Sequence, residues 1–234
     1  MVAACALALA VPLAACGAVD QQAERKPSPH GGATADAHHA DPTRVPGVSK
    51  RLQAQLPKGS SQVVAVYGTG RHSAESTVRL FTREGDRWAQ QRSWPAHNGR
   101  NGWTVHHREG DKRSPIGVFT LTDAGGVRAD PGTALPYTHS SAFTPPTYWP
   151  KKTRHDFDYV LAIDYNRVRH TSPLDPARPE GQSKGGGIWL HRDHGDGTSG
   201  CVSLSADAMR YLLRTLDPAR KPAVVMGDRG ALAA

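Results

Sequence analysis

One stretch of the sequence holds a histidine and a cysteine at the two ends of a glycine-rich segment. Residues 185–205 read GGGIWLHRDHGDGTSGCVSLS. The apolar Ile-Trp-Leu run predicts a short buried strand that ends at His191, and Gly195 and Gly197 predict a loop that turns the chain back. Cys201 follows after a tight turn. Because a thiol becomes nucleophilic when an imidazole takes its proton, the pattern favours a Cys201–His191 pair.

The turn before the cysteine supplies further groups that acyl chemistry requires. Gly200 permits a tight turn, and the backbone N–H groups of Gly200 and Cys201 are candidates for an oxyanion hole. The hydroxyls of Thr198 and Ser199 are candidates for hydrogen bonds to the imidazole or to a substrate. We expect the thiol and the imidazole of His191 to approach closely enough for proton transfer.

Three other kinds of chemistry compete for the same residues. His194 is an alternative base, but a strand end fixes His191 better than a glycine loop fixes His194. A zinc site with Cys201 and the neighbouring aspartates would have the spacing H-x-x-H-x6-C, which lacks a second cysteine and matches no zinc pattern. Ser199 is not part of a G-x-S-x-G nucleophile turn. We therefore predict no metal and no cofactor.

A mostly β domain is expected to position these groups, with one main helix packed on a sheet or sandwich. Ser205 predicts a helix N-cap, and an apolar stripe with helical spacing follows it. The segment 123–150 is rich in proline and aromatic residues and predicts an irregular excursion that either lines a groove with Tyr137, Tyr148 and Trp149 or packs them in the core. The predicted strands are 62–67, 77–83, 87–94, 118–121, 159–165 and 222–226.

The N-terminal part has the composition of an export signal and a linker. Residues 2–15 are apolar and end in LAAC, which resembles a lipobox with cleavage before Cys16 and a lipid on its thiol. We predict a lipoprotein signal peptide over 1–16, a disordered tether over 17–58 and a catalytic domain over 59–230. A plain disordered apolar N-terminus is the alternative. With a processed signal, Cys201 is the remaining free thiol, which indicates a reactive group.

The net charge of the chain and its distribution indicate which classes of partner it can bind. Lys and Arg total 29 against 21 Asp and Glu, giving a net charge of +8. The basic residues are spread along the chain without a block or an aromatic-basic alternation, which disfavours nucleic acid as a partner. Outside a membrane, a diffuse positive charge suits anionic cell-wall polymers or lipid headgroups.

Three motifs in this order resemble the L,D-transpeptidase catalytic domain, also known as the YkuD or ErfK/YbiS/YcfS/YnhG family. The first is REGD at 108–111 followed by SPIGVF at 114–119, and the second is GIWLH at 187–191. The third is TSGCVS at 198–203. The likeness runs from about Ser61 to Asp228, and it indicates a secreted lipoprotein subgroup of the family.

The resemblance implies a mostly β fold and a reaction on peptidoglycan stem peptides. Cys201 would attack the amide between the third residue and D-Ala of a stem tetrapeptide, with His191 as the base. D-Ala would leave, and an amine of another stem would resolve the thioester. Gly200 and Cys201 would supply the oxyanion hole, and Thr198 takes the Ser/Thr position of the motif.

One departure from the family pattern affects the acceptor. Ser199 stands where many members have a second histidine directly before the Gly-Cys pair. Two alternatives to cross-linking therefore remain: an L,D-carboxypeptidase or endopeptidase with water as the acceptor, or a non-catalytic wall-binding lipoprotein. In each case we expect an exported protein that is lipid-anchored through Cys16 to the outer face of the cell membrane.

Overall fold

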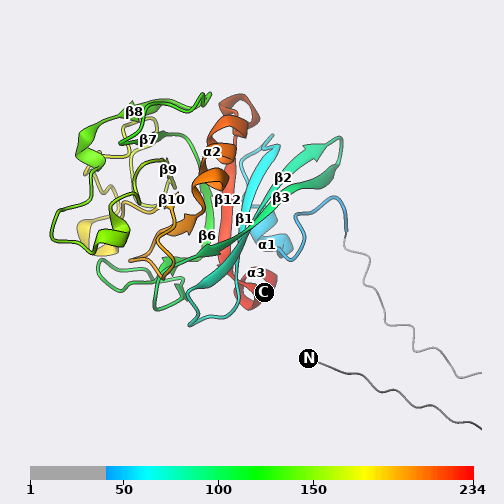
Figure 1. Ribbon diagram of the computed structural model, residues 1–234. Coiled ribbons are helices and arrows are strands. Elements are labelled where there is room, and N and C mark those ends of the chain that lie inside the picture. The colour runs from blue at the N-terminus through cyan, green and yellow to red at the C-terminus, as the bar shows by residue number, and fades with distance from the viewer. Residues whose placement is uncertain (1–40) are drawn as a thin grey trace, which may run out of the picture. The chain divides into compact units, whose positions relative to one another are not determined.

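A ten-stranded mixed sheet organises the described chain, which comprises residues 41–234 of a computed structural model (Figure 1). The strand order is β6-β12-β1-β2-β3-β11-β10-β9-β7-β8. The pairs β1/β12, β10/β11 and β7/β8 are parallel, and the other neighbouring pairs are antiparallel. The predicted mostly β fold with a mixed sheet is confirmed.

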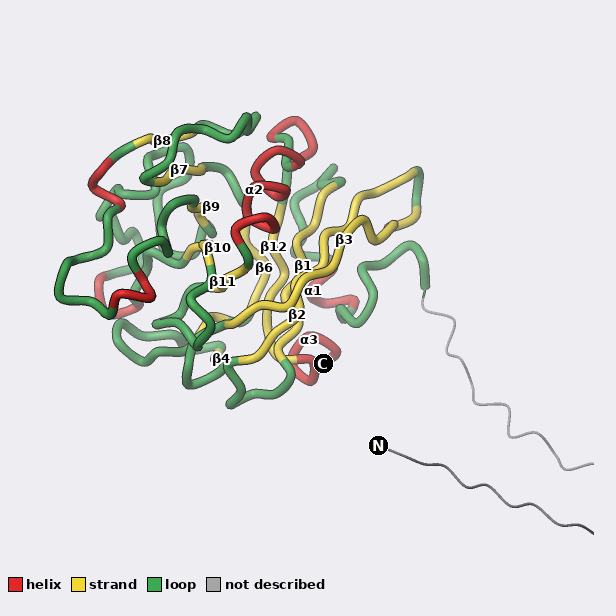
Figure 2. Tube along the Cα trace, in the orientation of Figure 1, coloured by secondary structure: helices red, strands yellow, loops and turns green. Residues whose placement is uncertain are grey.

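The strands vary greatly in length, as Figure 2 shows for the long β1–β3 and the short β9–β11. Two further short strands, β4 and β5, form a separate parallel pair. The strands are β1 (Gln62–Gly68), β2 (Glu75–Glu84), β3 (Arg87–His97), β4 (Trp103–Thr104), β5 (Ser114–Pro115), β6 (Gly117–Thr120), β7 (Ala124–Gly126), β8 (Tyr137–His139), β9 (Val160–Ala162), β10 (Trp189–Arg192), β11 (Val202–Leu204) and β12 (Ala223–Asp228). The helices are α1 (Lys50–Gln53), α2 (Ala206–Thr215) and α3 (Arg229–Ala233), with 3₁₀ turns η1 (Ser141–Phe143), η2 (Lys151–Thr153), η3 (Gln182–Lys184) and η4 (Pro218–Arg220).

Strand β1 is buried along its whole length because helices cover both faces of the sheet beside it. Side chains alternate between faces along a strand. Val64 and Val66 pack in the cluster that includes α2, whereas Val63 and Ala65 pack in a second cluster with Leu232 of α3. A strand buried on both faces reads as a continuous apolar run, and residues 62–67 have that pattern.

The predicted main helix after the cysteine is α2, which lies in front of β12 in Figure 1. Ser205 is its N-cap, and the Ser205 hydroxyl accepts the N–H of Ala208 at 3.2 Å. Met209, Leu212 and Leu213 are fully buried against the sheet. The apolar stripe therefore holds the segment that follows Cys201 onto the core.

Residues 41–58, which the sequence assigns to the tether, pack on the folded domain. Residues 1–16 and 17–40, which carry the predicted signal peptide and most of the tether, lie outside the described residues. Residues 41–58, however, pack on the domain: Val45, Val48 and Leu52 are buried in the cluster beside β1, and Tyr67 Oη donates to Pro46 O at 2.6 Å. The sequence does not reveal this packing, because three scattered apolar residues show no periodic pattern, although together they pack on one face of the sheet.

Two other boundaries also differ from the sequence expectations. Leu232 is fully buried, so the domain extends past the predicted end at residue 230. The segment 123–150 contains β7 and β8, which pair with each other in parallel and extend the sheet beyond β9. This excursion is therefore partly an edge of the sheet, and the rest of it is loop with the 3₁₀ turn η1.

A loop at residues 98–102 links the end of β3 to the region of Ser114. Gly102 N–H donates to Gly99 O at 2.7 Å, and Gly102 O accepts Ser114 N–H at 2.9 Å. Gly102 has a φ of +84°, and a Cβ there would meet Arg71 O at 2.0 Å. A residue with a side chain at position 102 would therefore have a strained backbone and would clash with the main chain of Arg71.

We predict that Gly102→Ala lowers the free energy of unfolding by about 3 kcal/mol or more, from left-handed strain plus the clash with backbone. Gly85→Ala is the matched control, because Gly85 has a φ of +64° but nothing within 4 Å of its added Cβ. The control should cost only about 1–2 kcal/mol. Urea unfolding of both variants measures the difference, and equal midpoints would contradict the steric argument.

Candidate active site

A pocket of about 610 Å³ contains both residues of the predicted pair, Cys201 and His191. Its walls come from β10, from the 193–201 loop and from the segment around η2. The other lining residues are Arg100, Trp149, Pro150, Lys152, Thr153, Asp156, Phe157, Gly187, Trp189, His194, Asp196, Thr198 and Ser199.

Parallel pairing of β10 with β11 places Cys201 beside β10, the strand that carries His191. Leu190 lies opposite Val202, so Cys201 lies beside Trp189. Trp189 N–H donates to Cys201 Sγ at 3.4 Å, and Sγ lies 3.5 Å from Gly187 O, to which the thiol donates. His191 lies two residues after Trp189, on the same face of β10. The two predicted site residues therefore come from neighbouring strands and line the same pocket.

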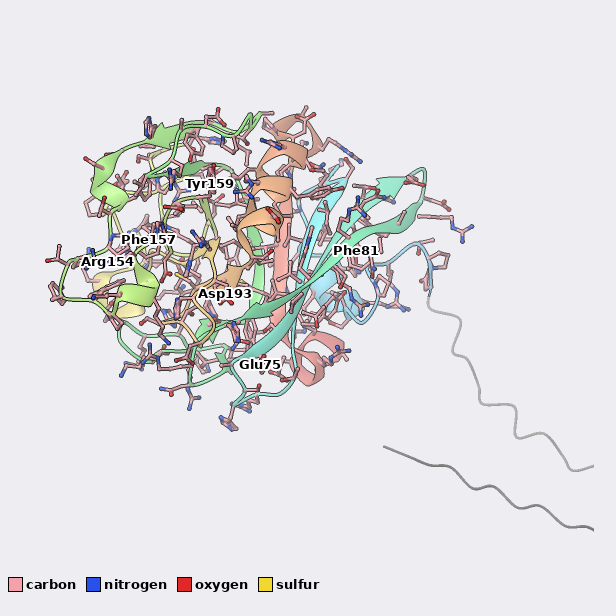
Figure 3. All side chains as sticks on the ribbon, in the orientation of Figure 1. Glu75, Phe81, Arg154, Phe157, Tyr159 and Asp193 are labelled. Carbon is pink, nitrogen blue, oxygen red and sulfur yellow. The ribbon has the colours of Figure 1, made fainter. Side chains whose placement is uncertain are left out.

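The imidazole of His191 is fixed and almost completely buried, with 3% of its surface exposed. Nδ1 lies 2.8 Å from Arg192 O, which accepts from it, so Nε2 is the nitrogen left for chemistry. The ring packs edge-to-face on Phe157, with 5.2 Å between centroids and an interplanar angle of 77°. Phe157 is labelled in Figure 3. Burial lowers the pKa of His191 to about 4, against the raising effect of the Arg192 carbonyl.

The thiol is neutral at rest for the same physical reason. Burial raises the pKa of Cys201 to about 11, although the Trp189 N–H acts in the opposite direction. At neutral pH the pocket therefore holds a thiol and an uncharged imidazole. Among the described residues, the thiol donates to Gly187 O and His191 Nδ1 donates to Arg192 O. The structure of residues 41–234 therefore shows no hydrogen bond between Cys201 and His191 themselves. The imidazole can thus act as a general base during attack, without a resting ion pair.

Thr198 organises the turn before the nucleophile. Its hydroxyl donates to Cys201 O at 2.6 Å and accepts the Gly200 N–H at 3.1 Å. This corrects the prediction for Gly200, because its N–H is already engaged and is not free for an oxyanion. Cys201 N–H makes no hydrogen bond within the described range, so it is the available donor. Ser199 is exposed and lines the pocket.

Gly200 is held from behind by Ser114. Ser114 Oγ donates to Gly200 O at 2.7 Å and accepts Gly99 N–H at 2.9 Å. Gly200 has a φ of +144°, and an added Cβ would come within 3.1 Å of Arg113 O. The turn therefore requires glycine, and the Ser114 hydroxyl fixes its carbonyl.

The sequence alone gives no role to the residues of the REGD and SPIGVF motifs. Asp111 accepts the N–H groups of Arg108 at 2.9 Å and Arg113 at 2.8 Å, which closes its own loop. Its carboxylate also lies 3.0 Å from Nδ1 of the buried His107. His107 in turn lies against Gly200. The two motifs thus form a support behind the nucleophile turn.

Asp193 and His194, which the sequence offered as zinc ligands or as an alternative base, make hydrogen bonds to other side chains. Asp193, labelled in Figure 3, accepts from His97 at 2.9 Å and from Ser203 at 2.7 Å. His194 lies 2.9 Å from Asp156, a residue that sequence reasoning did not single out. In residues 41–234, no group of three or more His, Cys, Asp or Glu side chains is arranged to hold a metal ion.

The aromatic residues of the 123–150 excursion divide between the two roles considered for them. Tyr137 packs against the main core. Trp149 lines the pocket and packs on Phe157, with 6.2 Å between ring centroids. Tyr148 is 84% exposed next to it.

Comparison with known proteins agrees with the motifs. The family model of the L,D-transpeptidase catalytic domain (YkuD) matches residues 72–225. The chain belongs to the L,D-transpeptidase catalytic domain family. Members of this family are typically enzymes. No curated protein matches the sequence significantly.

Two solved structures are similar to this member of the L,D-transpeptidase family. Bd1075 of Bdellovibrio bacteriovorus is 18% identical, with a TM-score of 0.44, over 79% of this chain and 53% of that one. Pgp2 of Campylobacter jejuni, described as a helical cell shape determining protein, is 14% identical, with a TM-score of 0.42, over 72% and 48%. The chain spans about half the length of each.

The neutral resting pair leads to a prediction for thiol reactivity. The rate of Cys201 alkylation by iodoacetamide should be low at pH 7 and rise about tenfold per pH unit toward pH 10, because the thiolate is the reactive form. Intact mass against time at each pH measures the rate. The Cys201→Ala variant gives the background from Cys5 and Cys16. A rate that is constant from pH 5 to 9 would instead indicate a resting thiolate–imidazolium pair.

Ser114→Ala should weaken both the fold and the nucleophile turn. The variant leaves the Gly200 carbonyl without its side-chain donor, which costs about 1–3 kcal/mol for a buried group. We expect a lower urea midpoint and slower acylation of Cys201 by a carbapenem. Ser141→Ala, at an exposed serine, is the control. An unchanged acylation rate for Ser114→Ala would show that the Ser114–Gly200 hydrogen bond is not needed for the reaction of Cys201.

Proposed function

We propose that the protein is a cysteine-dependent acyltransferase that acts on peptidoglycan stem peptides. The observation that carries the proposal is the presence of the Cys201 thiol and the oriented His191 imidazole in one pocket. Family membership supplies the substrate class. The products would be cross-linked or remodelled cell-wall peptides.

The reaction would begin when Nε2 of His191 takes the thiol proton as Sγ attacks the scissile carbonyl. Cys201 N–H is the available donor to the oxyanion, and Trp189 N–H stabilises charge on sulfur. When the tetrahedral adduct collapses, His191 returns the proton to the departing amine of D-Ala. The acyl group remains on Cys201 as a thioester until an acceptor resolves it.

The charges around the pocket suit an anionic peptide. Arg100 and Lys152 both line it, and stem peptides carry free carboxylates. Lys152 also lies 3.3 Å from Asp196, but both side chains are more than half exposed, so the ion pair is weak and exchangeable. A substrate carboxylate can therefore compete for either cation.

The proposed setting is the outer face of the cell membrane, with attachment through a lipid on Cys16. The support is the apolar run that ends in LAAC before Gly17. None of the helices in residues 41–234 combines the length and apolar character needed to cross a membrane. Metabolic labelling with an alkyne fatty acid, in the wild type and in Cys16→Ala, tests this attachment.

The acyl-enzyme should be detectable directly. A carbapenem carries a strained amide, so we expect it to add covalently to Cys201 and to raise the intact mass of the full chain by one carbapenem. Cys201→Ala should show no adduct, and His191→Gln should slow the addition by about 10²-fold or more, the contribution of a general base. Cys16→Ala is the matched thiol control. A wild type that behaves like Cys201→Ala would refute the proposal.

Incubation with disaccharide-tetrapeptide distinguishes the possible outcomes of the reaction. Mass spectrometry should reveal dimers if an amine is the acceptor, and disaccharide-tripeptide if water is the acceptor. Peptide binding without any product from the wild type would instead favour a non-catalytic wall-binding protein.

A further inference from the structure

A second histidine in the pocket has a buried carboxylate partner and no role in the proposed first half-reaction. The side chains of His194 and Asp156 are 8% and 5% exposed, and Nδ1 lies 2.9 Å from Oδ2. Both residues line the pocket that contains Cys201. Burying such a pair costs desolvation free energy, so its presence in the pocket beside Cys201 suggests a chemical role.

The pair is fixed relative to the first histidine by main-chain hydrogen bonds. Arg192, the residue after His191, donates its N–H to Asp156 O at 2.9 Å. Asp156 N–H donates to Thr153 O at 3.0 Å, which closes the turn after η2. Asp156 is therefore held at a set position beside the end of β10, and His194 follows it through the hydrogen bond.

The hydrogen bond also sets the tautomer of His194. An ionised carboxylate only accepts, so Nδ1 carries the proton and Nε2 keeps its lone pair. No hydrogen bond within residues 41–234 engages Nε2. His194 thus presents a proton acceptor to the pocket, and a proton gained there forms an imidazolium against the Asp156 carboxylate.

The charges around the pair come from several elements. Burial raises the pKa of Asp156 to about 6, whereas His194 and Arg192 favour its ionised form and Asp193 opposes it. His191 lies close enough for the charge of His194 to affect it. Arg100, Lys152 and Asp196 line the same pocket.

The second half-reaction also requires a base. The acceptor, an amine or water, must lose a proton as it attacks the thioester. His191 can take this proton as well, but burial disfavours its imidazolium form and its Nδ1 partner is a main-chain carbonyl, not a carboxylate. Ser199, next to Gly200, is a hydroxyl and cannot act as a base at neutral pH. His194 is an imidazole in the same pocket with a carboxylate behind it.

We propose that His194, oriented by Asp156, is the base that deprotonates the acceptor that resolves the Cys201 thioester. The acceptor nitrogen or oxygen bonds to the carbonyl carbon and gives its proton to Nε2 of His194. The C–S bond breaks and its electron pair goes to Sγ. The proton then passes from His194 through water to Sγ, which restores the thiol and the neutral imidazole. This inference rests on the proposed acyl transfer.

The experiment measures the two half-reactions of the full chain separately. The donor is disaccharide-tetrapeptide, and glycinamide is the added amine. Release of D-Ala in the first turnover reports acylation, and loss of the acyl-enzyme mass reports resolution, with and without glycinamide. The variants are His194→Gln and Asp156→Asn. The matched control is His155→Gln, since His155 is adjacent in sequence to Asp156 but 55% exposed and outside the pocket lining.

We expect His194→Gln to acylate within about twofold of the wild type and to resolve the thioester about 10²-fold more slowly, the usual contribution of a general base. Asp156→Asn should slow resolution in the same direction by a smaller factor. His155→Gln should match the wild type in both steps. Added imidazole should restore resolution in His194→Ala, which a purely structural role would not allow.

Three results would overturn the inference. Resolution at the wild-type rate in folded His194→Gln would remove His194 from the step. An equal loss of acylation and resolution, without rescue by imidazole, would assign it a structural role. A wild type that forms no acyl-enzyme would refute the proposed function and this inference together, whereas the first two results leave the acyl transfer intact.

Discussion

The parallel pairing of β10 with β11 is the constraint on which the site depends. Parallel neighbours usually need a long crossover connection, because the chain must return to the end at which it started. Here residues 193–201 make the return as a loop, and Cys201 arrives beside Trp189. The loop succeeds because Asp193 is clamped to His97 and Ser203, and because Thr198 bonds to the main chain of Asn98 and Arg100.

Burial explains why the site rests in an uncharged state. The same packing that fixes His191 on Phe157 also removes water from it and from the thiol, and each group then disfavours its charged form. Precise positioning therefore comes with a weaker base and a less acidic thiol. The Trp189 N–H, already directed at sulfur, offsets part of this cost when charge develops.

Local sequence patterns predicted much of the fold. The apolar run of β1, the β2–β3 hairpin and the stripe of α2 were identified because each pattern lies within one element. Pairings between distant segments were not predicted, since β11 and the contacts of Val45 depend on partners far away in the sequence.

In the candidate site, too, some residues could be predicted from local sequence and others could not. Cys201 and His191 lie close in sequence and could be predicted as a pair from local pattern alone, and both line one pocket. Asp156, which lies 38 residues before His194, carries no local signal. The engagement of Gly200 N–H by the Thr198 hydroxyl depends on a backbone geometry that residue types alone do not specify.

The position of β12 has a consequence for the order in which the molecule forms. This last strand lies between β6 and β1, whose residues precede it by more than a hundred positions. The β6 end of the sheet therefore cannot join β1 until the final strand is available, and such long-range pairing slows folding. During synthesis, the facing edges of β1 and β6 therefore stay unpaired until β12 emerges, and unpaired strand edges favour wrong pairing and aggregation.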